Sequence, residues 1–328
     1  MTMIRILLTG AAGFIGSHLL QRLVEDGHHV RAFVRYNSQN QWGWLETLPP
    51  FFLKSVEVWR GDLKDSEAVR KAVEGIEVVY HLAAVISIPY SYVNPLDIVQ
   101  TNVLGTVNLL NACLYSKSLV RFVHTSTSEV YGTARFTPIN EDHQQQAQSP
   151  YSASKIAADK LVESYHRSFN LPATIIRPFN TFGPRQSCRA IIPSIIGQAA
   201  YGGAVKVGSL SPVRDFCYVA DTVAGFIAVT SVEGAVGRVV NLGTGRGITI
   251  EALAKTILKL MGSNAELVVE DVRVRPELSE VMELVCDPSL ARSLSGWTAT
   301  YSLEAGLQET IAWMRDNLHR YKPEFYNI

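Results

Sequence analysis

Short apolar runs alternate with amphipathic segments along the first 180 residues of the chain. Each run is four or five residues long, as expected for strands buried on both faces of a parallel sheet, and the segments between the runs carry apolar residues at helical spacing. The expected strands are residues 4–8, 30–34, 56–59, 78–82, 122–125 and 173–177. This alternation predicts an α/β fold with a doubly wound parallel sheet.

A glycine-rich turn follows the first apolar run. It reads Gly10-Ala11-Ala12-Gly13-Phe14-Ile15-Gly16 and leads into a segment with Leu19, Leu20 and Leu23 at helical spacing. In such a turn the first glycine permits the tight bend, the second lets the backbone approach a pyrophosphate, and the third lets the helix pack on the strand. The phosphates lie at the helix N-terminus, where backbone N–H groups need partners. We therefore predict a dinucleotide site that includes Gly10, Gly13, Phe14, Ile15 and Gly16.

The pattern changes after residue 180. Turns become denser from about residue 181, and residues 239–242 form one more apolar run, which we interpret as a late strand of the same sheet. A helix over 249–261 then leads into a smaller C-terminal part. The expected domains are a Rossmann-type dinucleotide-binding domain, residues 1–180 with about 215–248, and a smaller, interleaved substrate domain, about 181–214 with 249–328.

Composition and charge narrow the classes of function. The 328 residues include 30 Lys and Arg and 30 Asp and Glu, so the net charge is zero and no basic block is dense enough to hold nucleic acid. No apolar run reaches the ~18 residues of a membrane span, and the first run lacks the cleavage pattern of an export signal. The four cysteines are scattered, which indicates reduced thiols and no metal site. We expect a cytoplasmic protein with no nucleic-acid or membrane partner. His81 and His124, at strand ends, are interpreted as structural histidines with satisfied hydrogen bonds.

Tyr151 and Lys155 are the first candidates for chemistry. They lie four residues apart on a predicted helix and therefore share one of its faces. A phenol of pKa about 10 is a poor base at neutral pH, but an ammonium group within a few ångströms favours its ionised form. The strand over 122–125 leads into Thr127-Ser128-Glu129. We interpret these two segments together as an active site.

The end of the second strand normally decides between NAD and NADP. An acidic residue there binds the adenosine ribose of NAD, whereas an arginine accommodates the extra phosphate of NADP. The acid is missing, and Arg35, with Arg31 as a second candidate, favours NADP; NAD and a solvated arginine stay open as alternatives. Asp62 follows the third strand and can accept from the adenine amino group, although an Asp at a helix start also has a structural explanation. The other residues expected beside the cofactor are Leu63, Ala83 and Ala84.

Several motifs stand together across nearly the whole chain. They are Gly-x-x-Gly-x-x-Gly, Gly61-Asp62-Leu63, His81-Leu82-Ala83-Ala84, Tyr-x-x-x-Lys, the run from Arg177 to Arg185, and Arg214-Asp215-Phe216. In this combination the chain resembles the extended short-chain dehydrogenase/reductase superfamily, and within it the nucleotide-sugar 4,6-dehydratases. Residues 33–45 resemble the legionaminic-acid-pathway dehydratases, which act on nucleotide-linked N-acetylglucosamine. Residues 275–288 are similar to those enzymes and also to GDP-mannose 4,6-dehydratase.

The resemblance implies a closed redox cycle at C4 of a sugar, with the cofactor retained. Tyr151 would take the O4 proton, while Lys155 would lower the tyrosine pKa and hold the nicotinamide ribose. Thr127 would hydrogen-bond the C4 hydroxyl, and Glu129 would take the C5 proton as the C6 hydroxyl leaves as water. Ser128 stands where the dTDP-glucose branch has Asp, and a serine is too weak an acid to protonate a leaving hydroxide unaided. That proton would come from Glu129 or from a water relay.

The resemblance also implies that five polar residues bind the sugar and the diphosphate, namely Asn180, Arg185, Arg189, Arg214 and Arg275. The nucleotide, GDP or UDP, stays open. Three other functions also stay open: a nucleotide-glucuronate decarboxylase, a nucleotide-sugar 4-epimerase and a non-catalytic dinucleotide-binding protein.

Two helices, expected over 94–116 and 151–169, carry apolar residues on more than one face. Related enzymes pair these helices with those of a second copy, so we expect a homodimer or a dimer of dimers. Burial beneath the second domain is the alternative explanation.

Overall fold

A seven-stranded sheet forms the centre of the computed structural model, which describes residues 3–322 and 325–326. Its order is β10-β6-β5-β4-β1-β2-β3, and every neighbouring pair is parallel. The strands are β1 (Arg5–Thr9), β2 (His29–Arg35), β3 (Val56–Gly61), β4 (Val78–His81), β5 (Arg121–Thr125), β6 (Ala173–Pro178) and β10 (Val239–Leu242). The predicted doubly wound fold is confirmed, as is the late strand over 239–242.

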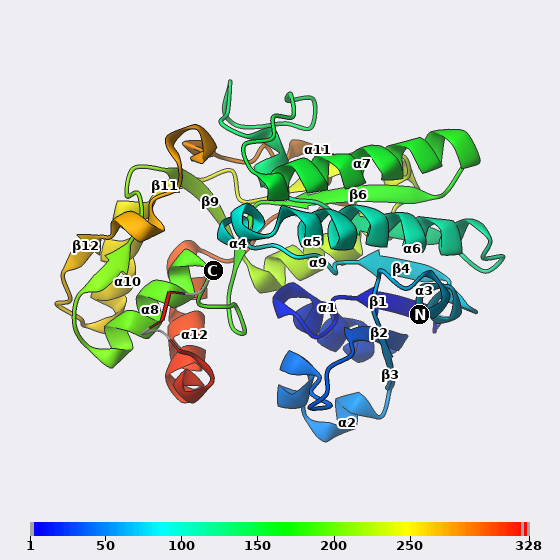
Figure 1. Ribbon diagram of the computed structural model, residues 1–328, viewed down its shortest axis with the longest axis horizontal. Coiled ribbons are helices and arrows are strands. Elements are labelled where there is room, and N and C mark those ends of the chain that lie inside the picture. The colour runs from blue at the N-terminus through cyan, green and yellow to red at the C-terminus, as the bar shows by residue number, and fades with distance from the viewer. Residues whose placement is uncertain (1–2, 323–324, 327–328) are drawn as a thin grey trace.

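Helices cover both faces of this sheet because alternate strand residues point to opposite sides. Ile6 and Leu8 of β1 pack into one apolar cluster, with residues of α1 (Phe14–Glu25) and α9 (Val219–Thr230). Leu7 packs into the other. The helices of this second face are α3 (Ser66–Val73), α6 (Gly105–Leu114) and α7 (Pro150–Phe169). In Figure 1 the long helices α6 and α7 run side by side in front of the strands.

The strand order changes direction between β1 and β4, which are neighbours although β2 and β3 lie between them in the chain. At such a switch point the connections leave to opposite sides and open a crevice at the carboxyl ends of the strands, where ligands bind in this class of fold. The glycine turn follows β1 and Ala83 follows β4 soon after its end.

The remaining helices are shorter or belong to the smaller part. They are α2 (Pro50–Leu53), α4 (Ile88–Val93), α5 (Pro95–Val99), α8 (Ile191–Tyr201), α10 (Ile250–Met261), α11 (Ser289–Ser295) and α12 (Leu303–Asp316). The helix expected over 94–116 is in fact α5, a π-helical turn (Gln100–Leu104) and α6 in succession.

The smaller part has its own apolar core, formed by α8, α10 and α12 on the left of Figure 1. Its strands are β7 (Asn180–Phe182), β8 (Val205–Val207), β9 (Val213–Tyr218), β11 (Gly247–Thr249), β12 (Leu267–Val269) and β13 (Glu283–Leu284). The domain boundary expected at about 215 falls inside β9, which pairs with β7, β11 and β13 and not with the large sheet. The chain returns to the large sheet with α9, because the apolar face of that helix packs there.

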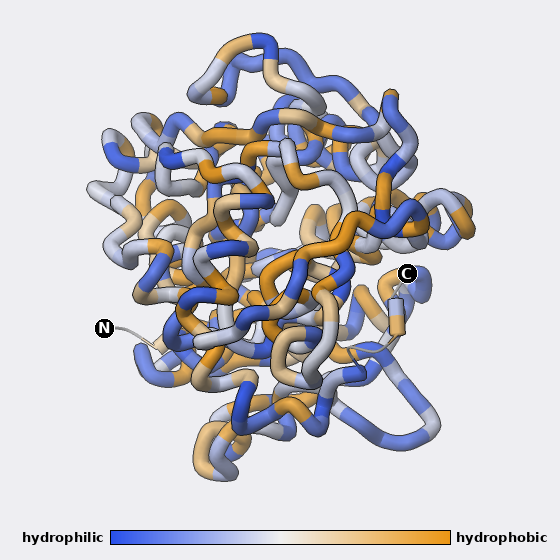
Figure 2. Tube along the Cα trace, turned by 90° about the vertical axis from the view of Figure 1, so that its left-hand side faces the viewer, coloured by the Kyte–Doolittle hydropathy of each residue, from blue (hydrophilic) through white to orange (hydrophobic). Residues whose placement is uncertain are grey.

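Hydrophilic segments follow the outermost loops, and hydrophobic segments lie mostly towards the interior (Figure 2). Among the helices of residues 3–322 and 325–326, none combines the length and the apolar character needed to cross a membrane.

Candidate active site

The glycine turn after β1 has the conformation that its glycines permit. Gly10 has a φ of +73°, and a Cβ there would lie 2.8 Å from the backbone nitrogen of Ala83. A Cβ on Gly16 would lie 2.1 Å from the carbonyl oxygen of Gly10. Gly13 is the N-cap of α1 and has no side chain to cap the first turn, which continues with Phe14 and Ile15. The N–H groups of that turn therefore suit the phosphates of a dinucleotide.

The ends of β1 and β4 are joined side by side at this crevice. The hydroxyl of Thr9 accepts a hydrogen bond of 3.2 Å from the backbone N–H of Ala83 and lies 2.8 Å from Nδ1 of His81. Nε2 of His81 lies 3.0 Å from the hydroxyl of Thr106, so both ring nitrogens of His81 have partners, as predicted. For His124 the prediction was wrong, because its Nδ1 is buried without a hydrogen-bond partner among the described residues. Ala83 and Ala84 are both half-buried beside the glycine turn.

Arg35 and Asp62 face each other at the carboxyl ends of β2 and β3. Nε of Arg35 lies 4.0 Å from Oδ2 of Asp62, and the arginine side chain is 74% exposed. Lys64 lies 3.9 Å from the same carboxylate. Asp62 is not a helix cap, because Asp65 supplies the side chain that caps α3. The carboxylate of Asp62 lies just after the end of β3 and is partly exposed, whereas the next residue, Leu63, is buried.

Arg31, the second candidate for binding a cofactor phosphate, already has hydrogen-bond partners within the protein. Its Nε donates to Glu57 over 2.8 Å, and its Nη1 donates to the carbonyl groups of Ala72 and Glu74. The guanidinium also lies over the ring of Trp59. The prediction for Arg31 was wrong, because its side chain closes the C-terminal end of α3 and does not face the crevice.

The two segments interpreted as an active site meet in the structure. Ser149 caps α7 through a reciprocal pair of hydrogen bonds with Ser152, and the helix begins at Pro150, directly before Tyr151. Tyr151 and Lys155 are both buried, and Nζ of Lys155 donates to the carbonyl group of Thr125 over 2.7 Å. The end of β5 and the first turns of α7 thus form one wall of the crevice.

Burial governs the charge of the tyrosine. It raises the pKa of Tyr151 well above the usual value, a hydrogen bond with Thr127 lowers that pKa, and the charges of Glu129 and Asp159 raise it. Burial also lowers the pKa of Lys155 to about 8, which Asp159 opposes. Lys155 is not among the groups that lower the Tyr151 pKa in this structure, contrary to the expectation. Its ammonium donates to Thr125, and the hydrogen bond that lowers the tyrosine pKa is with Thr127.

Two arginines and two carboxylates gather beside Tyr151. Nη1 of Arg275 lies 3.9 Å from Oε2 of Glu129 and 3.7 Å from Oε1 of Glu280. Nη2 of Arg214 donates to the same oxygen of Glu280 over 3.4 Å. Nη1 of Arg275 is buried without a hydrogen-bond partner among the described residues, so it has bonding capacity left for a ligand. The cluster joins the smaller part to the end of β5.

The other predicted substrate residues are more scattered. Asn180 begins β7, and its Nδ2 is buried without a partner among the residues that the structure describes. Arg185, in the left-handed region with a φ of +68°, donates to Gln21 and lies against α1. Arg189 is exposed and contacts only its neighbour Ser187 among described polar groups. The structure therefore brings Arg214 and Arg275 together and leaves Arg185 and Arg189 apart from them.

Sequence reasoning missed three polar residues at the site, Glu280, Asp159 and Asn102, and gave a fourth, His124, only a structural role. Glu280 was noted only as part of a motif, and Asp159 and His124 lie behind Lys155. Asn102, on the π-helical turn, donates to Ser154 and to the carbonyl group of Val85 and accepts from the N–H of Val85. Asn102 thus ties the loop after β4 to the catalytic helix. Its position among the apolar residues of a helix is the one signal that marks it in the sequence.

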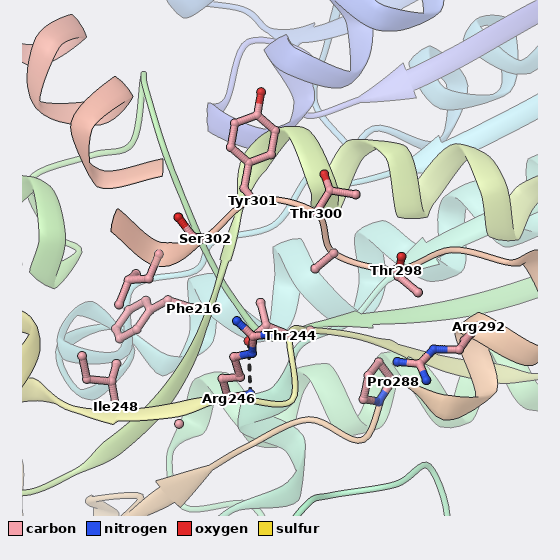
Figure 3. A pocket seen from close by; sticks show the side chains of 14 residues that line it. Phe216, Thr244, Arg246, Ile248, Pro288, Arg292, Thr298, Thr300, Tyr301 and Ser302 are labelled. Carbon is pink, nitrogen blue, oxygen red and sulfur yellow. Dashed lines mark hydrogen bonds between the residues drawn. The ribbon is translucent and has the colours of Figure 1, made fainter. Parts of the chain in front are cut away.

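A separate pocket of about 460 Å³ lies between the β10–β11 loop, α11 and the segment before α12 (Figure 3). Arg246, Arg292 and Tyr301 are among the residues that line it, and none of the predicted site residues is. The candidate site is therefore the crevice and not this pocket.

Comparison with known proteins places the fold and the site in a family. The family model described as GDP-mannose 4,6 dehydratase matches residues 7–310. The chain belongs to this family. The match confirms the resemblance to the nucleotide-sugar dehydratases of the extended short-chain dehydrogenase/reductase superfamily, whereas nothing in it singles out the legionaminic-acid-pathway branch.

Individual relatives cover almost the whole chain. The chain is 33% identical to dTDP-D-glucose 4,6-dehydratase of Mus musculus, over 97% of this chain and 90% of the mouse protein. It is 31% identical to UDP-glucuronic acid decarboxylase 1 of Xenopus tropicalis, over 96% of this chain and 73% of the frog protein.

Solved structures of similar proteins superpose closely. The dTDP-glucose 4,6-dehydratase DesIV of Streptomyces venezuelae, solved with NAD bound, has a TM-score of 0.87 and 26% identity over 98% of this chain and 99% of that chain. The UDP-glucuronic acid 4-epimerase of Bacillus cereus, solved with UDP-glucuronic acid and NAD, has a TM-score of 0.85 and 29% identity over 96% of this chain and 100% of that chain.

Proposed function

We propose that this protein is a nicotinamide-dependent 4,6-dehydratase that converts a nucleotide-activated hexose into its 6-deoxy-4-keto form. The observation that carries the proposal is the position of Glu129, whose carboxylate is close enough to Tyr151 to raise the phenol's pKa. A 4-epimerase needs only oxidation and reduction at C4. A carboxylate beside the tyrosine adds the base that elimination across C5 and C6 requires.

The steps follow from the positions of these side chains. Tyr151 in its ionised form takes the proton of the C4 hydroxyl, with Thr127 hydrogen-bonded to the tyrosine oxygen. A nicotinamide dinucleotide held by the first turn of α1 and by Lys155 would supply the redox chemistry, which is hydride removal at C4 and hydride return at C6. The C4 ketone acidifies the C5 proton, Glu129 takes that proton, and the C6 hydroxyl leaves as water. Ser128 is buried beside Glu129 and is not acidic enough to protonate the leaving group, so Glu129 or a water relay supplies that proton.

The crevice between β1 and β4 is the proposed cofactor site. The uncapped first turn of α1 would hold the pyrophosphate, and Lys155 would hold the nicotinamide ribose. The absence of an acid at the end of β2, together with the exposed Arg35, supports NADP as the cofactor. The relatives solved with NAD bound support NAD instead, with Asp62 beside the adenosine, so the choice needs a measurement.

The arginine pair of the smaller part is the proposed diphosphate site. Arg214 and Arg275 lie on either side of Glu280 and can each donate to phosphate oxygens. Asn180, with its unpartnered amide nitrogen, is the proposed contact to the sugar. We propose N-acetylglucosamine as the sugar, on the resemblance of residues 33–45, and GDP or UDP as the nucleotide.

A panel of nucleotide sugars tests the proposal. The purified protein is incubated with the GDP-linked and UDP-linked derivatives of glucose, mannose, N-acetylglucosamine and glucuronic acid. The masses of the products are then measured by mass spectrometry. We expect loss of water from a hexose substrate. Loss of carbon dioxide from UDP-glucuronic acid would favour a decarboxylase, the activity named for the Xenopus relative. A product of unchanged mass with C4 inverted would favour an epimerase.

We also propose that the protein self-associates through α5, α6 and α7. Leu96, Val99 and Leu104 are exposed on α5 and the π-helical turn, and Phe169 is exposed at the end of α7. Their exposure supports self-association over burial beneath the smaller part as the explanation for these four residues. Two such helix pairs would form a four-helix interface in a homodimer.

A further inference from the structure

A buried polar cluster lies behind Lys155, on the side away from Tyr151. His124 of β5 and Asp159, one turn further along α7, are fully buried with the lysine. Nζ of Lys155 lies 3.5 Å from Nε2 of His124, and the same ring nitrogen lies 3.5 Å from Oδ1 of Asp159. The imidazole therefore stands between an ammonium group and a carboxylate.

The two oxygens of Asp159 have different surroundings. Oδ2 accepts from Ser126 over 2.9 Å and from Nη2 and Nε of Arg177 over 2.9 and 3.1 Å. Oδ1 has no hydrogen-bond partner among the described residues and lies 3.5 Å from Nε2 of His124. Oδ2 alone therefore holds the Arg177 guanidinium, and Oδ1 contacts the imidazole whose Nε2 also lies 3.5 Å from Lys155.

The charges of the cluster are set by burial and by one another. Burial and the charge of Lys155 lower the pKa of His124 to about 4, so the ring is neutral at pH 7. Burial alone would raise the pKa of Asp159, but the contact with His124 and the charge of Arg177 lower it to about 2. The remaining groups that face the lysine are Tyr151 on its own helix and His81 on β4, whose pKa burial and the charges of His124 and Lys155 lower well below the usual value. Asp159 is therefore the negative charge that stabilises the buried ammonium.

We propose that Asp159 is a positioning residue, which acts through His124 to keep Lys155 charged and in place for the cofactor. The inference rests on the proposed function, because it takes the ribose of a nicotinamide dinucleotide as the group that Lys155 binds. If Asp159 served only as the counterion of Arg177, its Oδ2 atom would be sufficient. That role does not explain why Oδ1 faces His124 or why the imidazole lies between Asp159 and Lys155.

The negative charge of Asp159 determines the direction in which its removal shifts the pKa of Lys155. The carboxylate raises the pKa of Lys155 from the value that burial alone would give. Its removal lowers that pKa further, so the ammonium loses its proton at a lower pH. An opposite charge within a few ångströms typically shifts a pKa by about one unit or more.

The proposal can be tested by measuring the affinity for NAD and for NADP by isothermal titration calorimetry, over a pH series centred on about 8. This experiment does not require the enzyme to turn over a substrate. For the parent we expect affinity to fall as the pH rises through about 8. In Asp159→Asn the same fall should occur at least about one pH unit lower. Ser126→Ala removes one hydrogen bond to Asp159 and keeps its charge, so its pH profile should match the parent.

His124→Leu provides a second variant, because it keeps the pair of Asp159 and Arg177 intact even if Asp159→Asn does not fold. Its binding profile should also move to lower pH. Parent-like profiles in either folded variant, or a parent profile without an alkaline fall, would overturn the proposal. If the parent binds a dinucleotide but dehydrates no nucleotide sugar, the proposed function fails while this measurement still decides the role of Asp159.

Discussion

Arg275 and Glu129 meet across the two parts of the molecule, with Nη1 of the arginine 3.9 Å from Oε2 of the carboxylate. Arg275 belongs to the segment proposed to bind the diphosphate, and Glu129 is the proposed base for C5. A diphosphate that recruits the guanidinium would therefore act directly on the partner of the catalytic carboxylate. We therefore expect binding and elimination to be coupled at this contact, and the first prediction concerns Glu129.

Glu129→Gln should block elimination while leaving oxidation at C4 possible, because the amide has the shape of the acid but cannot take the C5 proton. We expect product formation to fall at least about a hundredfold and the absorbance of the reduced nicotinamide to build up with substrate. In deuterated water the parent should place solvent deuterium at C5. A variant as active as the parent, or a product without deuterium at C5, would contradict the dehydratase mechanism.

Tyr151→Phe should abolish turnover and leave the cofactor bound, since the change removes the O4 proton acceptor and little else. We expect a fall in kcat of at least about a hundredfold, measured with the substrate that the panel identifies. Tyr165→Phe, on the same helix, loses a hydroxyl that donates to Asn111 at the surface, and it should keep parental activity. Undiminished turnover in Tyr151→Phe would show that Tyr151 is not the base that takes the O4 proton.

Arg35→Ala should weaken the binding of NADP more than the binding of NAD if the guanidinium meets the extra phosphate. The measurement is the ratio of the two dissociation constants. Arg70→Ala, which removes another exposed arginine paired with Glu67 and Glu74 on α3, is the control and should leave the ratio unchanged. An equal effect of Arg35→Ala on both cofactors would make Arg35 a solvated surface residue.

Leu104→Glu should convert a dimer into a monomer, because it places a charge in the proposed four-helix interface. Leu104 is 53% exposed, and light scattering coupled to size-exclusion chromatography gives the mass. Leu278→Glu changes a leucine that is 90% exposed outside these helices, and it should leave the mass unchanged. A parent that is monomeric at micromolar concentration would rule out the interface.

Stability should fall in acid because histidines are buried in their neutral form. Burial, with a contribution from Arg185, lowers the pKa of His18 from 6.5 to about 4. The unfolded chain then binds more protons between these values, so the stabilisation is complete above pH 6.5 and is lost as the pH falls towards about 4. The loss is on the order of 3 kcal/mol for one such histidine. The free energy of unfolding, measured by denaturant titration at several pH values, should depend less on pH in His18→Gln than in the parent. His29→Gln, which changes an exposed histidine, should keep the parental pH dependence. The same pH dependence in His18→Gln and in the parent would contradict this explanation.

The sequence by itself determined the architecture and the local motifs. The length and spacing of apolar runs decide strand or helix within a few residues, so the parallel sheet, the glycine turn and the pairing of Tyr151 with Lys155 on one helical face could be predicted. The late strand over 239–242 could also be assigned, because a short apolar run is typical of a strand covered on both faces, and it pairs with β6 at the edge of the sheet.

Only the tertiary structure decided which distant side chains meet. Arg31 and Arg35 lie four residues apart on β2, so the strand period puts them on the same face and they look alike in sequence. Glu57 and two carbonyl groups nevertheless bind the first, while the second lies beside Asp62. Likewise, Arg275 reaches Glu129, and Arg189 reaches no other candidate. The physical reason is that apolar spacing is a property of neighbouring residues, whereas ion pairs and buried hydrogen bonds depend on how separate elements pack.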